Sequence, residues 1–258
     1  MTYEIELGGR RALVTGAGQG VGRAMAHALA RAGAEVVVND VVGERSAQVV
    51  DEIVADGGVA RVAVFDVTDY SAVTDAVDAI GGIDVVVNNA GNAGVEGMAD
   101  RGAFAESDPA DWNRYVAVNL YGVMHCCRAA LPGMIERGWG RLITIVSDAG
   151  RVGEKSAAAY SAAKAGAAGL TRTLAIENGR YGITANNISL GAMHTPLTDA
   201  LWSDPEQPAA RAMLQRYAIR RPGLPNDVAP LVVHLASDAA SWITGQTYPV
   251  NGGYSFSL

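Results

Sequence analysis

The sequence contains very little cysteine, and its two thiols are neighbours. Cys126 and Cys127 are the only cysteines among 258 residues. Adjacent cysteines rarely bridge each other, so we expect reduced thiols in a helix. The histidines show no metal-ligand spacing; they are His27, His125, His194 and His234. We therefore expect neither a disulfide framework nor a metal site.

Long apolar runs and basic tracts are also missing. No stretch of about 18 uncharged apolar residues occurs. The first eleven residues carry Glu4, Glu6, Arg10 and Arg11 rather than a basic segment followed by an apolar one. We therefore expect a cytoplasmic protein. The net charge of -7, without a Lys/Arg tract, argues against nucleic acid or a membrane surface as a partner.

The chain has ample apolar material for one large core. Its residues are 49% hydrophobic and 18% charged, which fits a single domain over residues 1–258. Strand-like runs are expected at 11–15, 35–40, 60–65, 83–87, 141–146, 183–188 and 247–250. Helical patterns alternate with them at 21–32, 44–55, 70–80, 108–137, 156–180 and 226–236. Such units predict an α/β fold, a Rossmann-like doubly wound parallel sheet flanked by helices on both faces.

A glycine-rich loop stands between the first predicted strand and helix. It reads Thr15-Gly16-Ala17-Gly18-Gln19-Gly20-Val21-Gly22, with the spacing G-x-x-x-G-x-G instead of G-x-G-x-x-G. Glycines let the backbone of this loop, Gln19 and Val21 included, approach a pyrophosphate whose charge the helix N-terminus stabilises. The loop therefore predicts dinucleotide binding.

Carboxylates end the second predicted strand and follow the third. Asp40 lies about 20 residues beyond the glycine loop, where a carboxylate accepts both hydroxyls of an adenosine ribose and repels a 2′-phosphate. It predicts NAD rather than NADP; alternatively, it caps the helix that begins near Gly43. Asp66 and Val67 stand at the sheet edge where adenine would lie, and a plain helix cap is the alternative for Asp66.

Polar residues follow the fourth predicted strand and interrupt the long helix. Asn88-Asn89-Ala90-Gly91 lies at the carboxyl edge, where open α/β sheets bind ligands, although Asn and Gly also form plain turns. The polar segment 92–107 is expected to form a rim of the site. Asn119 lies among apolar residues of the helix, so its amide must find hydrogen-bond partners.

The expected chemistry centres on Ser147, Tyr160 and Lys164. Tyr160 and Lys164 are four residues apart in a helical pattern, which places them on one face, one turn apart. Ser147 ends a predicted strand and is positioned to bring a hydroxyl beside the phenol at a substrate carbonyl oxygen. By itself, a Tyr-x-x-x-Lys pair can also arise by accident on any helix.

The lysine supplies enough electrostatic stabilisation for the tyrosine to act near neutral pH. A free phenol has a pKa of about 10, and proton exchange near neutrality requires about 3 to 4 kcal/mol of help. A cation about 4 Å away at an effective dielectric of about 20 contributes about 4 kcal/mol before its own desolvation is subtracted. The pair therefore predicts an acid/base centre.

The region after the sixth predicted strand suits a mobile cover over a substrate. Residues 190–220 are polar and proline-bearing and end in a helical pattern, which favours a lid.

In their order and spacing, these motifs resemble the short-chain dehydrogenase/reductase family, in its compact single-domain branch, over about residues 9–253. The resemblance rests on the glycine loop, the Asn88-Asn89-Ala90-Gly91 segment, Asn119, Ser147 and Tyr160-x-x-x-Lys164. It implies an oxidoreductase that interconverts a secondary alcohol and a ketone by hydride transfer with NAD(H). It also implies a homotetramer.

The resemblance implies a role for each motif. Tyr160 would be the acid/base, Ser147 would hold the reacting oxygen, and Lys164 would lower the phenol pKa while binding the nicotinamide ribose. Asn119 would fix a water beside Lys164. Backbone near Ile188, together with Gly191 and Thr195, would hold the nicotinamide. Two departures from the family pattern are Leu190, where proline is usual, and Asn251, where aspartate is common; we expect Asn251 to have little catalytic effect.

The resemblance leaves the substrate open. Residues 147–153 are similar to those of dehydrogenases acting on alicyclic hydroxyacyl-CoA thioesters, and the whole chain is also similar to 3-oxoacyl-thioester reductases. The resemblance therefore implies a hydroxyacyl or oxoacyl thioester, or an alicyclic or other small hydroxy compound. With a CoA thioester, basic side chains near the site would meet the CoA phosphates or, alternatively, lie in surface ion pairs; they are Arg151, Arg211, Arg216, Arg220 and Arg221. A catalytically silent NAD-binding sensor or scaffold is the alternative, although it would be free to lose Ser147, Tyr160 or Lys164. A sugar-nucleotide epimerase or dehydratase would need a different glycine spacing and a longer C-terminal region.

Overall fold

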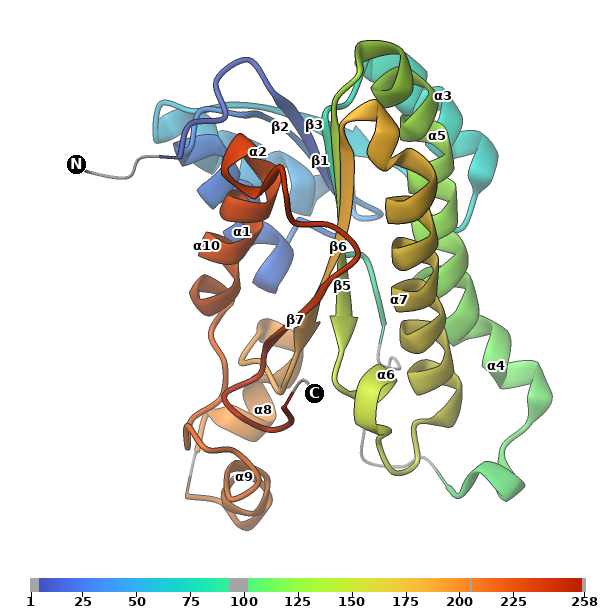
Figure 1. Cartoon of the computed structure of the whole chain (residues 1–258). Coiled ribbons are helices and arrows are strands. Elements are labelled where there is room, and N and C mark those ends of the chain that lie inside the picture. Colours follow the sequence, from blue (N-terminus) through green and yellow to red (C-terminus); the bar gives the residue numbers. More distant parts are fainter. Residues whose placement is uncertain (1–4, 93–101, 205, 257–258) are drawn as a thin grey trace.

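A parallel sheet forms the centre of the molecule. The structure, a computed structural model, describes residues 5–92, 102–204 and 206–256. Within these residues seven strands run in the order β3-β2-β1-β4-β5-β6-β7 (Figure 1). The strands are β1 (Arg11–Val14), β2 (Glu35–Asp40), β3 (Val59–Val64), β4 (Val85–Asn88), β5 (Gly140–Ser147), β6 (Ile183–Leu190) and β7 (Thr247–Val250).

Helices connect the strands. They are α1 (Gly20–Arg31), α2 (Gly43–Ala55), α3 (Tyr70–Ile80), α4 (Pro109–Val116), α5 (Gly122–Arg137), α6 (Ala149–Val152), α7 (Ala158–Asn178), α8 (Asp199–Trp202), α9 (Pro208–Leu214) and α10 (Pro225–Ala236). Single 3-10 turns lie at Phe104–Glu106, Gly179–Tyr181, Pro196–Thr198 and Asp238–Ala240. A π-helical turn, η2 (Ala117–Tyr121), joins α4 to α5.

Two apolar layers cover the two faces of the sheet. Met25 of α1 and Leu235 of α10 belong to one buried cluster, which α2 also joins. Val73 of α3, Met134 of α5 and Ala167 of α7 belong to the other. Figure 1 shows α1, α2 and α10 on one side of the sheet and α3, α5 and α7 on the other. Burial on both faces explains why the strands read as nearly continuous apolar runs.

Several helix ends follow clear sequence signals. The Asp69 side chain accepts from the Ala72 amide at the start of α3, and Gly81 ends that helix with a φ of 76°. Asp108 accepts from the Ala110 amide at the start of α4, where Pro109 is the first helical residue. Both starts use the acceptor that unpaired helix amides require.

The predicted fold class is confirmed, and each predicted strand lies within two residues of its observed bounds. The long predicted helix 108–137 is present, but the π turn η2 divides it and contains Asn119. The short helix α6 was not predicted, because glycines and polar residues in 147–155 hide a helical pattern. None of the helices in the described ranges is long and apolar enough to cross a bilayer.

The strand order reverses direction at β1. This strand pairs with β2 on one side and β4 on the other, and the connections that follow wind in opposite directions along the sheet. Open α/β sheets bind their ligands at the carboxyl ends of the strands beside such a reversal. The glycine loop after β1 and the Asn89 segment after β4 meet at this point.

Candidate active site

The glycine loop leaves room for a phosphate-bearing ligand at the start of α1. A Cβ on Gly22 would lie 2.3 Å from the Gly16 carbonyl oxygen, so only glycine fits there. Gln19, which precedes α1, makes no capping bond through its side chain. An uncapped helix N-terminus beside a glycine loop attracts an anion through its free amides and its dipole. The loop therefore fits the pyrophosphate of a dinucleotide.

Neutral polar side chains hold this loop in place. The Asn89 amide donates to the carbonyl oxygens of Thr15 and Gly16 at 2.9 and 3.0 Å. The Thr15 hydroxyl accepts from the backbone amides of Asn89 and Ala90, each at 3.0 Å. Asn89 therefore does more than form a turn. Asn39, buried in β2, accepts from the Gly16 amide at 3.4 Å; sequence reasoning missed it, although an amide inside an apolar strand was a usable signal.

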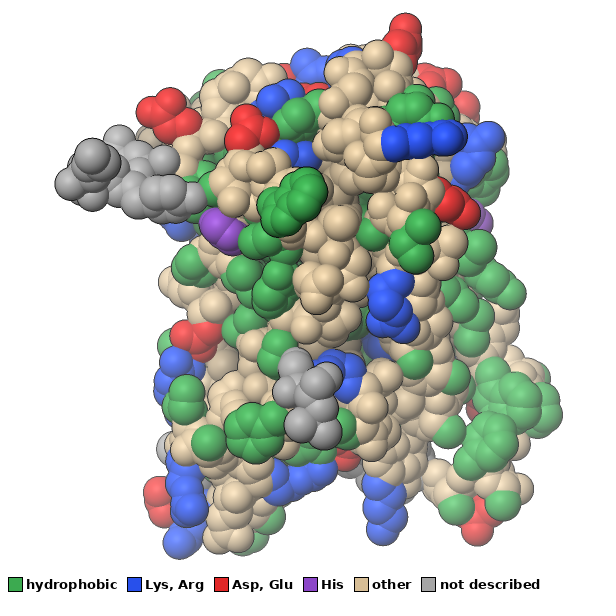
Figure 2. All heavy atoms as spheres, in the orientation of Figure 1, with side chains coloured by type: hydrophobic (Ala, Val, Ile, Leu, Met, Phe, Trp, Pro, Cys, Tyr) green, Lys and Arg blue, Asp and Glu red, His purple; other side chains and the backbone are tan. Residues whose placement is uncertain are grey.

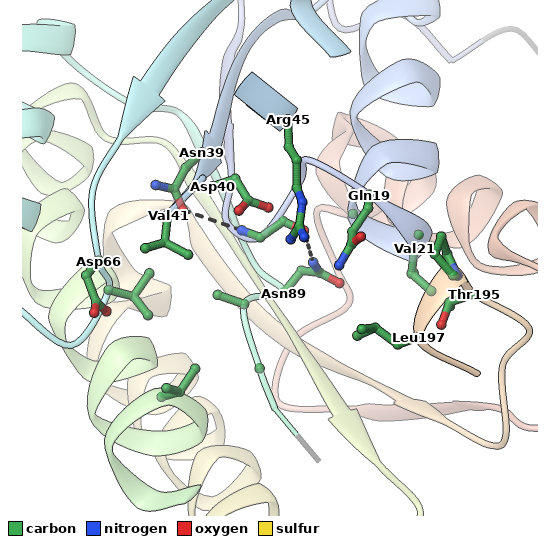
Figure 3. A pocket seen from close by; sticks show the side chains of 18 of the residues that line it. Gln19, Val21, Asn39, Asp40, Val41, Arg45, Asp66, Asn89, Thr195 and Leu197 are labelled. Carbon is green, nitrogen blue, oxygen red and sulfur yellow. Dashed lines mark hydrogen bonds between the residues drawn. The ribbon is translucent and has the colours of Figure 1, made fainter. Parts of the chain in front are cut away.

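One pocket gathers most of the predicted cofactor residues (Figure 3). From the predicted set it is lined by Gly16, Gln19, Gly20, Val21, Gly22, Asp40, Asp66, Val67, Asn89, Ala90, Gly91 and Thr195. Tyr160, Lys164 and Gly191, which were also predicted to contact the cofactor, are not among the lining residues. Gly191 packs instead against Tyr217 and Asn251, where a Cβ would lie 3.0 Å from the Tyr217 ring and 3.1 Å from the Asn251 Cα.

The part of the pocket that lies after β2 holds a carboxylate and a cation. The Asp40 carboxylate is buried and accepts from the backbone amides of Gly18 and Val42 at 3.1 and 3.0 Å. It does not cap α2, whose N-cap residue is Val42. Arg45, in the first turn of α2, also lines the pocket (Figure 3). Sequence reasoning missed Arg45, which lies five positions after Asp40.

Asp66 lies in a local turn after β3, where the sequence predicted the adenine. Its carboxylate accepts from both the amide and the hydroxyl of Thr68 at 2.8 and 2.9 Å. The helix cap of α3 is Asp69 instead. Asp66 and Val67 both line the pocket, as expected from their position after β3.

Lys164 and Tyr160 lie on the same face of α7. The Lys164 Nζ atom is 5.9 Å from the centroid of the Tyr160 ring and donates to the Ile145 carbonyl oxygen at 2.9 Å. A Cβ on Gly91 would lie 3.2 Å from that Nζ and 2.8 Å from Asn119 Oδ1. The lysine, the asparagine and the end of the glycine pocket therefore converge at Gly91.

Burial changes the acid/base behaviour of Lys164. Its side chain is 5% exposed, and desolvation lowers its pKa from 10.5 to about 8. Loss of water disfavours the charged ammonium. A ligand that offered hydroxyl oxygens to the Nζ atom would restore part of that solvation and favour the cation.

The π turn presents Asn119 to the same place. Its amide donates to the carbonyl oxygens of Asn92 and Tyr115, each at 2.9 Å. Its Oδ1 atom is buried and has no hydrogen-bond partner in the described part of the chain. An orphaned buried acceptor beside Lys164 fits a bound water or ligand hydroxyl.

Ser147 ends β5 opposite Leu190 of β6. Its hydroxyl accepts from the Ala149 amide at 3.2 Å. The short helix α6 begins two residues later and packs on α7, where a Cβ on Gly150 would lie 2.8 Å from the Ala165 amide. The loop that bears the serine therefore rests directly on the helix that bears Tyr160 and Lys164.

Most of the arginines proposed to meet CoA phosphates take partners within the chain. Arg151 pairs with Asp148, Arg211 with Glu206, Arg216 with Glu154 and Arg221 with Asp227. Figure 2 shows basic side chains gathered at the lower edge of the molecule, over the α9 and α6 region of Figure 1. The ion pairs favour the structural interpretation over phosphate binding for these four.

Proteins whose parallel sheet reverses its order beside such a glycine loop are nucleotide-binding proteins of the Rossmann type, and this chain is one of them. A family model described as enoyl-(acyl carrier protein) reductase matches residues 16–255. The chain belongs to the short-chain dehydrogenase/reductase family, as its motifs predicted. It is therefore an oxidoreductase of hydroxyl and keto groups that takes a nicotinamide cofactor.

Relatives in this family act on different molecules. A subunit of (2S)-[(R)-hydroxy(phenyl)methyl]succinyl-CoA dehydrogenase from Thauera aromatica is 39% identical, covering 95% of this chain and 96% of its own length. The 7alpha-hydroxysteroid dehydrogenase of Escherichia coli is 37% identical, with 96% and 95% covered.

Two solved structures superpose closely and carry different cofactors. A gluconate 5-dehydrogenase from Burkholderia cenocepacia, in complex with NADP and tartrate, has a TM-score of 0.89 at 35% identity, covering 99% of this chain and 98% of its own. A 3-oxoacyl-[acyl-carrier protein] reductase from Brucella melitensis, with bound NAD, has a TM-score of 0.88 at 33% identity, with 98% and 95% covered.

Proposed function

We propose that the chain interconverts a secondary alcohol and a ketone with NAD(H), with Tyr160 as the acid/base. The observation that carries the proposal is the placement of Lys164 Nζ 5.9 Å from the Tyr160 ring centroid, beside the Gly91 end of the pocket. A catalytically silent NAD-binding module would have no need of this arrangement. All of Ser147, Tyr160 and Lys164 are present and clustered around one sheet edge.

Each residue has a separate task in the proposed reaction. The bound nicotinamide supplies or accepts the hydride. The Ser147 hydroxyl donates a hydrogen bond to the reacting oxygen, and the Tyr160 hydroxyl gives that oxygen a proton during reduction or takes one during oxidation. Lys164 stabilises the phenolate and binds ribose hydroxyls, and Asn119 Oδ1 holds a water beside its Nζ. Thr195 contacts the nicotinamide end of the pocket, and residues 190–220 form a lid over the substrate.

Removal of the phenol hydroxyl tests this assignment. Tyr160→Phe keeps the ring beside Lys164 and should reduce kcat by roughly 100- to 10,000-fold, because the proton donor is lost. NADH binding, measured by fluorescence titration, should change little. Tyr181→Phe, in the 3-10 turn that follows α7, is the matched control and should keep full activity. Near-normal turnover by Tyr160→Phe would rule the assignment out.

We propose NAD(H) as the preferred cofactor, with Arg45 limiting the preference. The buried Asp40 carboxylate lines the ribose end and would repel a 2′-phosphate, whereas the guanidinium of Arg45 would attract one. Asp40→Ala should therefore lower the ratio of kcat/KM with NAD to kcat/KM with NADP, and Arg45→Ala should raise it, each by about tenfold. A ratio unchanged in both variants would place the selectivity elsewhere.

The proposed substrate is a hydroxyacyl or oxoacyl thioester, with alicyclic and other small hydroxy compounds as competitors. A thioester is supported by the acyl-CoA relative and the acyl-carrier reductase structure. An NADH-consumption screen over 3-oxoacyl-CoAs, cyclic ketoacyl-CoAs and free ketones tests the choice. Turnover of free ketones alone would exclude the thioester.

A homotetramer is the proposed assembly. The terminal strand β7 leaves one sheet edge open, and Trp242 near it is 99% exposed. Ile176 on α7 is 85% exposed. Exposed large apolar side chains beside an open edge are common where subunits pack. Sedimentation equilibrium, which should give four times the chain mass, tests the assembly.

A further inference from the structure

A buried carboxylate lies directly after the serine of the proposed active site. Asp148 is 2% exposed. Its Oδ1 atom accepts from the Ser189 hydroxyl at 2.6 Å, and its Oδ2 atom accepts from the Asn251 amide at 2.6 Å and the Ser255 hydroxyl at 2.9 Å. One carboxylate thus joins the end of β5, the end of β6 and the segment after β7, which are far apart in sequence.

The chain end after β7 is tied to the same loop by a second residue. Arg151 of α6 donates to Asp148 Oδ1 at 3.1 Å, to the Ser255 hydroxyl at 3.0 Å and to the Phe256 carbonyl oxygen at 3.1 Å. In Figure 1 the segment after β7 accordingly runs beside α6. The arginine is therefore committed to the chain end rather than to a substrate phosphate.

The same segment shapes the turn after β6. The Asp148 amide donates to the Leu190 carbonyl oxygen at 3.0 Å, and Gly191 packs against the Cα of Asn251. Ile219, beyond α9, donates from its amide to the Gly252 carbonyl oxygen at 2.8 Å. Residues 251–256 therefore contact three segments, and their position affects all of them: the residues that directly follow Ser147 (the Ser147 loop), the turn after β6, and the end of the proposed lid segment.

We propose that Asp148 is a positioning residue that, through Asn251, clamps residues 251–256 against the Ser147 loop and so fixes the serine hydroxyl relative to Tyr160. The proposal rests on the proposed role of Ser147. It also explains the asparagine at position 251 and replaces the earlier expectation that this residue has little catalytic effect, because an aspartate there would place two carboxylates within 2.6 Å of each other. The clamp requires a carboxylate at one position and an amide at the other.

Both acidic and basic side chains surround the clamp. Arg151 of α6 faces Asp148 directly, and Tyr217, after α9, interacts electrostatically with it. Farther out, Glu154 pairs with Arg216, and Tyr254 donates to Glu154. Arg151 is a charge partner for one carboxylate in the cluster. It does not supply a partner for a second.

An exchange of the two side chains tests the clamp. Asn251→Asp should lower kcat at pH 8 by about tenfold or more and recover as the pH falls towards 6, because one of the paired carboxylates then takes a proton. Asp148→Asn replaces one of the two acceptor oxygens by an NH2 donor, so either Arg151 or Asn251 loses its acceptor and kcat should fall at every pH. The double variant restores one carboxylate and one amide, but a carboxylate at position 251 loses the bond that the Asn251 amide donates to the Ser255 carbonyl oxygen at 2.8 Å. It should therefore be more active than either single variant and less active than the wild type. KM for NADH should stay unchanged throughout.

Hydrogen exchange of residues 250–256 and of the Ile219 amide supplies a readout that needs no turnover. Exchange should be about tenfold faster in either single variant and slower in the double variant than in either single one. Asn113→Asp adds the same charge on the exposed surface of α4 and should alter neither exchange nor the pH profile. A double variant no better than the singles, or Asn251→Asp with a wild-type profile and wild-type exchange, would overturn the clamp. If the unaltered chain reduces no substrate while the exchange pattern holds, the proposed function fails and the clamp stands.

Discussion

Two parts of the sheet's carboxyl edge hold their loops by different means. We call the part after β1 and β4 the cofactor end and the part after β5 and β6 the substrate end, following the proposed function. After β1 and β4, neutral amides and hydroxyls such as Asn39 and Asn89 hold the glycine loop. After β5 and β6, ionised groups do so, through the pairs of Asp148 with Arg151 and of Glu154 with Arg216. Most of the bonds at the cofactor end use groups that do not titrate, and the Asp40 carboxylate, which accepts from the Gly18 amide, is an exception. At the substrate end the loop contacts include ion pairs, so mutations that break ion pairs should change kcat mainly there.

Lys164 lies between the cofactor end and the substrate end, and its removal should have the largest effect on kcat. Lys164→Met keeps much of the buried volume and removes the cation beside Tyr160. We expect kcat to fall by roughly 100-fold or more, because the phenolate loses its stabilising charge. Steady-state kinetics with saturating NADH measure the change. Lys155→Met, in the exposed loop before α7, is the control and should keep normal turnover. A Lys164→Met variant with unchanged kcat would contradict the acid/base assignment.

The same variant should change how stability depends on pH. The folded chain holds Lys164 with a pKa of about 8, whereas an unfolded lysine titrates near 10.4. Between these values the unfolded state binds more protons, so the cofactor-free protein gains stability as the pH rises from about 8 to about 10. The gain is on the order of 3 kcal/mol. Denaturant unfolding of Lys164→Met should lack this rise, and an equal rise in both proteins would contradict it.

Gly22→Ala should weaken NADH binding without disturbing the substrate end. Its effect should be smaller than that of Lys164→Met. The new Cβ would lie 2.3 Å from the Gly16 carbonyl oxygen and 2.6 Å from the Asn89 amide. Overpacking of this kind costs about 1 to 3 kcal/mol, which is roughly 5- to 150-fold in NADH affinity if the loop moves to relieve it. Calorimetric titration measures the affinity. Gly8→Ala, where a Cβ meets nothing within 4 Å, should bind NADH normally.

The sequence predicted the cofactor end far better than the substrate end. The residues of its loop belong to short motifs whose physical role can be read from the sequence, and Gly16, Gly20, Gly22, Asp40 and Asn89 all line one pocket. Strand positions were equally readable, because β-branched runs buried on both faces have no other interpretation.

The substrate end depends on contacts between segments that are distant in sequence. Nothing in the local pattern indicates that Asp148 meets Asn251, or that Arg151 is used by the chain end instead of a ligand. The π turn at Asn119 was equally hidden, because one extra residue in a helix leaves the apolar pattern nearly unchanged. Such features appear only once the sheet has brought the segments together.

The smallest expected effect comes from breaking an ion pair between α1 and α2 at the cofactor end. This change tests whether such a pair affects NADH binding or turnover. Glu52 of α2 accepts from Arg23 at 2.7 Å and from His27 at 3.0 Å, both on α1. The hydrogen bond from Arg23 chiefly lowers the pKa of Glu52 from 4.5 to about 2. Its contribution to stability is therefore full above about pH 4.5 and is lost as the pH falls towards 2.

A partly exposed pair of this kind contributes less than about 1 kcal/mol. Glu52→Gln should lower the melting temperature slightly at neutral pH, and the difference from wild type should vanish near pH 2. NADH affinity and kcat should both stay unchanged, because the pair lies on the helices and not on the loop they support. A loss of NADH affinity in Glu52→Gln would mean that the cofactor end, too, depends on charge, and the contrast between the two ends would fail.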